Sequence, residues 1–251
     1  MKTKWIHIFL ISLTMLTWTS TVTAEEQEKE PDTWQFGVAP YAWFTTIKGD
    51  MNMGLPGLNI SPDDLLSNLE LGALISLEAR RKRWLVMTDI VYLKASGSET
   101  LRDGPFASRH ANLDVESWVV DMYGGYNAVK SDWLILDAVI GLRYFSMAND
   151  LSIKGTGGVV DINVSDTVEL LNGVVGVRGA VLLGKGWFLP YHLDAGAGDA
   201  KFTWQGMAGV GYSFDWIELI AAYRYMSFES DNNKVDSLTM GGPLLGIKFV
   251  F

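Results

Sequence analysis

The feature that most constrains this chain is an alternation of apolar and mixed side chains, which recurs in segments of about ten residues or more. In the stretch 134–145, the even-numbered positions are all apolar or aromatic, whereas the odd-numbered positions include Asp137 and Arg143. Successive side chains of a β-strand point to opposite faces, so both charges lie on one face and the other face is wholly apolar. The same pattern recurs in 69–80, 172–183 and 216–226. Such segments, separated by turn residues, are typical of a transmembrane β-barrel.

About ten segments of this kind follow one another, and an even number places both ends of a barrel on the same side of the membrane. They cover 34–48, 70–80, 84–95, 112–127, 133–146, 168–183, 187–198, 202–214, 216–228 and 238–251. Short connections at 81–83, 129–132, 184–186 and 215 alternate with long ones at 49–69, 96–111, 147–167 and 229–237; only 199–201 departs from this order by being short. We predict an all-β, up-and-down antiparallel barrel of about ten strands. Eight or twelve strands are the alternatives, because the long loops can hide or absorb a pair.

Aromatic residues mark both ends of these segments. A tryptophan begins each of the five segments that leave the short-turn side: Trp34, Trp84, Trp133, Trp187 and Trp216. Indole rings settle where hydrocarbon meets water, so these residues predict a collar at one membrane interface. For the opposite rim we predict a second aromatic girdle, made of Tyr41, Trp43, Phe44, Tyr92, Tyr144, Trp204, Tyr225 and Phe228. The uniform face carries almost no Lys or Glu, which favours lipid rather than water outside the barrel.

The N-terminal residues differ from the rest. Lys2 and Lys4 precede an apolar run over 5–16 and a small-residue stretch that ends at Ala24, which predicts a secretory signal peptide over 1–24. We expect a mobile acidic tail over 25–33 and the barrel over 34–251. Cleavage would change the net charge from 20 − 29 = −9 to 18 − 29 = −11. So acidic a chain, without a basic stripe, is a poor candidate for binding nucleic acid. The absence of cysteine excludes disulfides and thiolate metal sites, and we expect neither a metal nor a cofactor.

Several stretches resemble those of small outer-membrane β-barrel proteins of Gram-negative bacteria, a group of mostly uncharacterised members. They are FGVAPYAWF, VIGLRYF, WQGMAGVGYSF, AAYRYMSF and the terminal GGPLLGIKFVF. The last is the most specific, with Leu245, Ile247, Phe249 and Phe251 alternating outward. The resemblance implies that this ending is the signal read by the barrel-assembly machinery, and it carries over no catalytic residue. We expect a location in the bacterial outer membrane, with both termini periplasmic and with membrane lipid and lipopolysaccharide as surroundings. The oligomeric state is left open.

The mixed face predicts a set of charges inside the barrel. These are Arg80, Arg143, Arg178, Arg224 and Lys248, with Glu70, Glu78, Asp89, Asp121, Asp137, Asp194 and Glu218. Such groups can form an internal network that closes the lumen or can line a small polar pore. The near balance of signs favours pairing over ion selection. Arg178 and Asp121 are the first candidates for partners of Asp137 and Arg143.

The sequence predicts a non-enzymatic barrel, either a narrow channel or a structural and surface-interaction protein. The alternative is a barrel enzyme that modifies lipid A or cleaves peptides at the outer rim. Its strongest support is His192, which shares a face with Asp194 and could act as a general base. No nucleophile accompanies this pair, and loop acids such as Asp103, Asp150 and Glu229 form no motif.

Two loops carry their own predictions. Ser61 as N-cap, Pro62 at the first helical position, and Asp63 and Asp64 near the helix start predict a short helix over 61–69, either a cap on the rim or a plug in the lumen. Residues 151–164 predict a hairpin above the membrane. Because Ile162 and Val164 share the parity of inward Arg178, we expect a bulge near 165–167.

Overall fold

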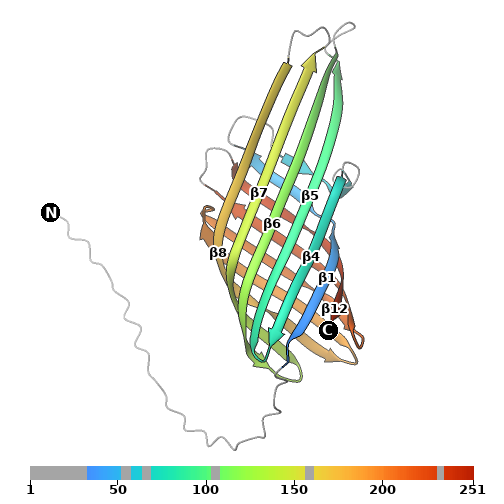
Figure 1. Ribbon diagram of the computed structural model, residues 1–251, viewed down its shortest axis with the longest axis vertical. Helices are drawn as coiled ribbons and strands as arrows, with labels where there is room; N and C mark the ends of the chain where they lie inside the picture. The colour runs from blue at the N-terminus through green and yellow to red at the C-terminus, as the bar shows by residue number, and fades with distance from the viewer. Residues whose placement is uncertain (1–32, 52–57, 64–68, 103–107, 156–160, 231–234) are drawn as a thin grey trace, which may run out of the picture. The chain divides into compact units, whose positions relative to one another are not determined.

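The structure is a computed structural model that describes residues 33–51, 58–63, 69–102, 108–155, 161–230 and 235–251. The predicted signal peptide and all but the last residue of the predicted tail lie outside these residues. Within them, twelve β-strands are present (Figure 1). Their bounds are β1 (Gln35–Trp43), β2 (Thr46–Met51), β3 (Leu58–Ile60), β4 (Leu69–Arg81), β5 (Trp84–Arg102), β6 (Ser108–Lys130), β7 (Leu134–Gly155), β8 (Asp161–Gly184), β9 (Trp187–Gly198), β10 (Phe202–Ser213), β11 (Ile217–Glu229) and β12 (Val235–Val250). No helix in this part of the chain is both long enough and apolar enough to span a membrane.

The strands form a closed antiparallel barrel with ten strands in its wall and one extra strand, which confirms the predicted fold and strand count. From β4 to β12 each strand pairs with its neighbour in the chain, and β1 pairs with both β4 and β12. Phe36 and Phe251 close the seam by exchanging backbone hydrogen bonds of 3.1 and 2.9 Å. The chain therefore enters and leaves the barrel at the end that carries the short turns.

The first strand of the wall is interrupted at Phe44 and Thr45. Below the break, β1 pairs with β4 as far as Pro40 and Ile75; above it, β2 pairs with β12 on one side and with the short β3 on the other. The predicted strand 34–48 is therefore two segments, β1 and β2, and β3 is the extra strand. The helix predicted over 61–69 is not seen as an element. Only Pro62 and Asp63 have helical backbone, and residues 64–68 lie outside the described residues.

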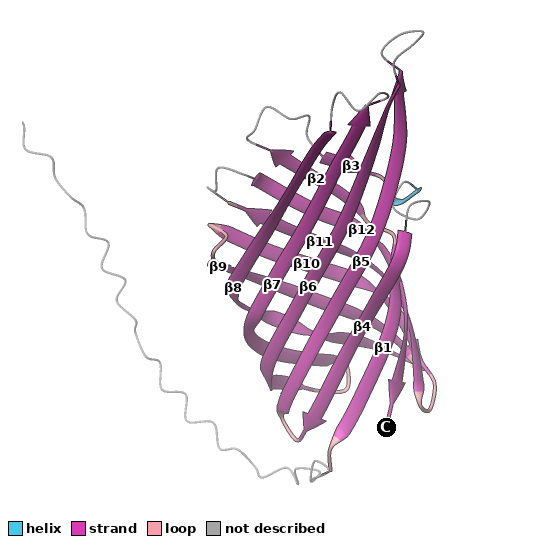
Figure 2. Cartoon of the chain, turned by 45° about the horizontal axis from the view of Figure 1, so that its top comes forward, coloured by secondary structure: helices cyan, strands magenta, loops and turns pink. Residues whose placement is uncertain are grey.

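Strands β5 to β8 are much longer than their counterparts and rise as a tall sheet above the rest of the barrel (Figure 1, Figure 2). They have 19 to 24 residues, whereas β9 to β11 have 12 or 13. A membrane-spanning strand needs about 9–11 residues. At about 3.3 Å per residue, the excess of roughly ten residues corresponds to about 30 Å of strand beyond the rim.

The bounds predicted for the strands beside two of the long connections are thus too short. Most of 96–111 and 147–167 is strand rather than loop, because polar residues outside the bilayer continue the ladder begun within it. The predicted hairpin is confirmed by the pairing of Ile153 with Ile162. The predicted bulge near 165–167 is wrong, because the pairing of β7 with β8 is continuous from Leu134 to Lys154.

The wall has the two faces that the alternation predicts. Even-numbered residues of β7 such as Ile140 and Leu142 are more than half exposed, whereas Asp137, Arg143 and Phe145 on the other face are buried. The five collar tryptophans are between 50% and 66% exposed, at the short-turn end. The outer surface of the wall is therefore apolar, as contact with membrane lipid requires.

The predicted outer girdle is only partly correct. Two outward pairs of rings, Tyr92 with Trp118 and Trp204 with Tyr225, lie in contact on the outer face. Tyr41, Trp43 and Phe228 instead point into the barrel, where Trp43 and Phe228 are buried and the Tyr41 hydroxyl bonds interior charges. The alternation of side chains along each strand explains this orientation, since these three aromatic residues share the inner face with inward-pointing neighbours.

The turn between β8 and β9 contains two glycines at which the effect of adding a Cβ can be tested. Gly184 and Gly186 both have positive φ, at 82° and 84°. A Cβ at Gly186 would lie 2.8 Å from the carbonyl oxygen of Ser213, whereas a Cβ at Gly184 would meet nothing within 4 Å.

Gly184→Ala is expected to lower the free energy of unfolding by about 1–2 kcal/mol, the cost of a left-handed backbone with a Cβ. Gly186→Ala is expected to cost at least about 1 kcal/mol more, because it adds a clash with the neighbouring turn. Urea unfolding of both variants in lipid vesicles measures the difference. Equal losses would contradict the steric part of this account.

Candidate functional site

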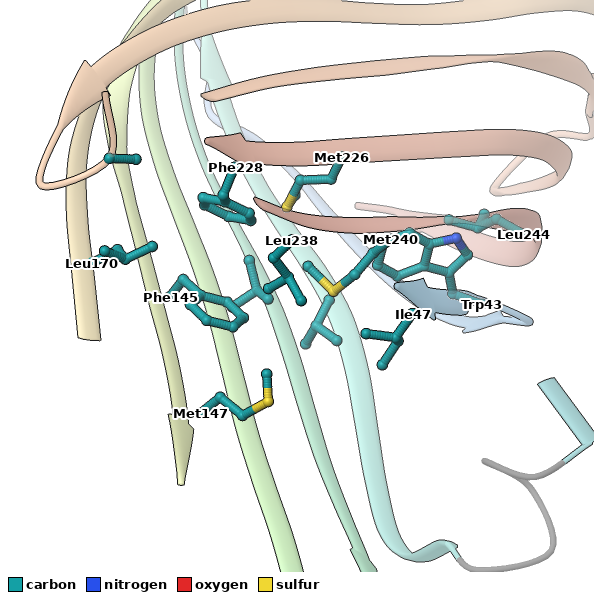
Figure 3. Packing of buried hydrophobic residues seen from close by; sticks show 13 residues of the cluster. Trp43, Ile47, Phe145, Met147, Leu170, Met226, Phe228, Leu238, Met240 and Leu244 are labelled. Atoms are coloured by element: carbon teal, nitrogen blue, oxygen red, sulfur yellow. The ribbon is translucent and has the colours of Figure 1, made fainter. Parts of the chain in front are cut away.

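An apolar layer packs inside the barrel (Figure 3), toward the strand ends that lie away from the short turns. Phe145 of β7 and Phe228 of β11 meet across the lumen with ring centroids 5.1 Å apart, and both are about 1% exposed. The layer consists of Trp43, Ile47, Val91, Val119, Phe145, Met147, Leu170, Ala200, Met226, Phe228, Leu238, Met240 and Leu244. These contacts join side chains from distant strands of the wall across the lumen at this level.

Directly below the apolar layer, Arg143 is completely buried, with 0% of its surface exposed. Its Nε donates to Asp121 Oδ1 at 2.7 Å, and its Nη2 donates to Asp194 Oδ2 at 2.9 Å. It also donates to the hydroxyls of Tyr123 at 2.9 Å and Thr203 at 3.3 Å. The two carboxylates come from β6 and β9, so one guanidinium joins three strands of the wall.

Arg224 forms the second half of this ion-pair layer. Its Nη1 donates to Asp89 Oδ2 at 2.6 Å and to the Tyr41 hydroxyl at 3.0 Å. Its Nε and Nη2 donate to Gln205 Oε1, at 3.1 and 2.7 Å. Nη2 also reaches Asp121 Oδ2 at 3.3 Å, so Asp121 is shared by both buried arginines. The Arg224 guanidinium carbon also lies 4.9 Å from the centre of the Trp43 ring, which ties this layer to the apolar one.

Glycine on the mixed face makes room for these long side chains. Gly141 pairs with Tyr123, and a Cβ at Gly141 would lie 2.8 Å from a ring carbon of that tyrosine. Gly176 pairs with Asp194, and its Cβ would lie 2.6 Å from the Asp194 Cβ. These two glycines therefore leave space for polar neighbours in the network, and a Cβ at either would also meet a backbone carbonyl oxygen of the next strand, that of Met122 for Gly141 and that of Leu193 for Gly176.

A second charged cluster lies nearer the short turns, around the carboxylate of Glu78. Arg178 Nη2 donates to Glu78 Oε2 at 3.0 Å, Arg80 Nε lies 3.5 Å from Oε1, and Lys248 Nζ lies 3.5 Å from Oε2. Lys248 also lies 3.8 Å from Glu218. These side chains retain 13–26% exposure, in contrast to the buried pair of arginines above.

Asp137 belongs to this lower cluster, but its partner differs from the prediction. Arg178 is its cross-strand neighbour, yet the Asp137 carboxylate is held by Arg80 of β4 at 2.6 and 3.1 Å and by Asn127 at 2.7 Å. The bidentate contact runs across the lumen, which pairing along the wall does not foresee. The structure does place Asp121 against Arg143, as expected from the sequence. The side chain of Glu70 lies outside the described residues.

His192 and Asp194 lie inside the barrel, with His192 Nε2 at 2.6 Å from Asp194 Oδ2. Asp194 Oδ2 also accepts hydrogen bonds from Tyr123 and Arg143. His192 is 6% exposed, and its ring forms a T-shaped pair with the Tyr123 ring, with centroids 5.3 Å apart. Among the described residues, no group of His, Asp and Glu side chains is arranged to hold a metal ion. The pair is therefore a member of the ion-pair layer, distant from the outer rim.

A cavity of about 530 Å³ extends from the ion-pair layer to the short turns. Its inner end is formed by the layer itself, through Asp89, Asp121 and Arg224, and its outer end reaches the turn residues Asp132 and Gly186. Between them lie the lower charged cluster and apolar residues. The sequence predicted the charges inside the barrel but not this cavity, because the depth of the cavity depends on where the apolar layer begins.

The closed wall, the apolar outer surface and the filled interior define a protein with the fold of an outer-membrane β-barrel. The outer-membrane protease OmpT of Escherichia coli is similar in structure, with a TM-score of 0.51 and 9% identity over 90% of this chain and 99% of that one. The translocator domain of the autotransporter NalP from Neisseria meningitidis has a TM-score of 0.48 at 13% identity, covering 88% and 90%. Ail, the attachment invasion locus protein of Yersinia pestis, has a TM-score of 0.41 at 12% identity, covering 87% and 98%. No protein-family model matches the chain, and neither does any curated protein.

Proposed function

We propose that this protein is a closed, non-enzymatic barrel of the bacterial outer membrane, which acts as a structural and surface-interaction protein rather than as a channel. The observation that carries this proposal is the pair of buried layers across the lumen. Arg143 has no exposed surface and Phe228 almost none, which supports a lumen closed to water at both levels. Near-balanced, mutually paired charges favour a closed network over an ion-selective lining.

The location and orientation are part of the same proposal. Residues 1–24 act as a cleaved signal peptide, and both ends of the mature chain face the periplasm. The collar of exposed tryptophans at the short-turn end supports this orientation, as does the tall β5–β8 sheet at the other end, since outer-membrane barrels have short periplasmic turns and larger extracellular parts. Phe249 and Phe251 then belong to the ending that the barrel-assembly machinery reads.

The position of His192 supports a non-enzymatic role. A base that acts on lipid A, or on a peptide at the outer rim, must reach the outer surface of the barrel. His192 points inward, bonds Asp194 and is separated from the extracellular side by Phe145, Phe228 and the rest of the apolar layer.

The tall sheet is the part that supports a surface interaction. Over 97–102, β5 pairs only with β6, and over 161–170, β8 pairs only with β7, among the described strands. Both edges thus stand beyond the last described pairing of their outer neighbours, near Ala95 and Gly198. Strand edges with unused backbone groups are sites at which an extended segment of another molecule can add.

Recordings in planar bilayers test the closed lumen. The purified full-length protein, inserted into a phospholipid bilayer in 1 M KCl, is expected to give no discrete current steps between about −150 and +150 mV, because the buried layers leave no aqueous path. An open porin inserted under the same conditions controls for insertion. Reproducible steps from this protein would contradict the proposal and favour the narrow channel.

A further inference from the structure

We propose that the cavity at the short-turn end is a binding site for a small organic anion with an apolar body, held by Arg178 and entered from the periplasm. The orientation rests on the proposed function, whereas the binding chemistry does not. The cavity is blind, because the ion-pair and apolar layers close its inner end. Its volume of about 530 Å³ lies within the usual range of ligand sites, about 300–1,000 Å³.

Arg178 has hydrogen-bonding capacity to spare. Its Nη2 donates to Glu78 Oε2 at 3.0 Å, but its Nη1 is buried and makes no hydrogen bond within the described residues. Each guanidinium nitrogen of Arg80, beside it, has an acceptor, with two contacts to Asp137 and one to Glu78. A guanidinium nitrogen without an acceptor is costly. Nη1 itself is covered, but the Arg178 side chain lines the cavity and keeps 20% of its surface exposed, so a turn of the guanidinium would bring its free donor to an acceptor supplied by a ligand.

The acids inside the cavity are already engaged, which leaves the spare donor of Arg178 for a ligand. Three cations, Arg80, Arg178 and Lys248, converge on the carboxylate of Glu78. Asp137 is held by Arg80 and Asn127, Glu218 lies 3.8 Å from Lys248, and Asp89 and Asp121 are engaged with Arg224. The access route is basic: the four short turns and the strand ends beside them carry five basic residues, Arg81, Lys82, Arg83, Lys130 and Lys185, against the acids Asp132 and Asp215.

The remainder of the lining defines the body of the ligand. The uncharged side chains around the cavity are mostly apolar and come from opposite sides of the barrel: Met87, Ile135, Leu182, Phe188, Ile220 and Leu244. Apolar walls with one oriented polar anchor are the usual composition of a small-molecule site. A carboxylate attached to an aromatic or short aliphatic group fits both parts.

Calorimetric titration of the full-length protein in lipid nanodiscs with sodium 2-naphthoate tests this inference, with empty nanodiscs as the blank. Saturable binding of one naphthoate per chain is expected. The neutral 2-naphthamide and the cationic 2-naphthylmethylammonium are expected to bind at least about tenfold more weakly, because a charge-assisted hydrogen bond contributes on the order of 1.5–3 kcal/mol. Heat that is matched by the blank, or a cation that binds as tightly as naphthoate, would overturn the proposal.

Arg178→Gln is expected to weaken naphthoate binding by about tenfold or more. Lys48→Gln is the control, because it removes one positive charge from an exposed side chain of β2 that does not line the cavity; a change within about threefold is expected. Equal losses in the two variants would assign the effect to general charge and refute Arg178 as the anchor.

Ala39→Phe narrows the cavity while leaving Arg178 in place, and it is expected to abolish binding. This variant decides the matter if Arg178→Gln does not fold, as judged by circular dichroism. Undiminished binding to a folded Ala39→Phe protein would place the site elsewhere. Since none of these measurements involves current through the barrel, a conducting barrel that still binds naphthoate through Arg178 would refute the proposed function alone.

Discussion

Replacing Arg143 by methionine is expected to lower the free energy of unfolding by about 3–5 kcal/mol, the usual cost of removing one partner from a buried ion pair. Asp121 and Asp194 would remain buried beside an apolar side chain of similar length. Asp121 would keep only its longer contact with Arg224, and Asp194 would keep His192 and Tyr123. Urea unfolding in lipid vesicles, followed by tryptophan fluorescence, measures the loss.

Lys248→Met is the matched control for this prediction. Lys248 is partly exposed, its contacts with Glu78 and Glu218 are 3.5 and 3.8 Å long, and Glu78 retains two arginine partners without it. A loss below about 1 kcal/mol is expected. Combining Arg143→Met with Asp121→Asn and Asp194→Asn is expected to recover part of the stability, because the uncompensated charges are removed. If Arg143→Met costs no more than Lys248→Met, the buried layer is not a main source of stability.

Phe228→Ala is expected to cost about 3–5 kcal/mol, as is usual when a buried aromatic ring is removed from a packed interior. Its ring packs against Phe145, and both lie in the centre of the apolar layer. Phe228→Leu, which keeps most of the volume, is expected to cost less than about 1.5 kcal/mol. The same unfolding measurement separates the two, and similar losses would show that packing at this position is loose.

Neither Phe228 variant is expected to conduct ions, because the ion-pair layer below remains intact. Bilayer recordings of Phe228→Ala check this expectation. Current steps in this variant, with none in the parent protein, would make the apolar layer the sole seal and Arg143 and Arg224 a lining rather than a barrier.

The sequence predicted the wall of the barrel better than its contents. Alternation along each strand separates the outward Ile140 from the inward Asp137, because lipid tolerates almost no charge and the pattern has a strict period of two. The same rule would have placed Phe228 inside, since it shares the parity of Arg224. We assigned it to the outer girdle because aromatic residues near strand ends suit an interface and a packed interior equally well.

The contacts across the lumen were beyond the reach of sequence. Pairing along the wall suggested Arg178 for Asp137, whereas the barrel's diameter and strand stagger bring Arg80 there instead. The length of β5 to β8 was underestimated for a different reason. Beyond the bilayer both faces of a strand can be polar, so stretches such as 96–102 lose the alternation that identifies a strand.

The seam between the first and last strands has a consequence for how the barrel is made. Apart from this seam, which β2 extends by pairing with β12, and from the pairing of β1 with β4, the described wall strands pair with neighbours that are adjacent in the chain, and such pairs form with little loss of chain entropy. Phe36 and Phe251 are 215 residues apart, so their pairing loses the most chain entropy. No neighbouring strand pair supports it until the intervening strands have assembled. An unsealed sheet exposes both of its edges, β1 and β12, as templates for misassembly. Phe251 thus belongs to the last strand pairing to form. An accessory factor that holds β12 until β1 pairs with it would protect the open sheet from misassembly.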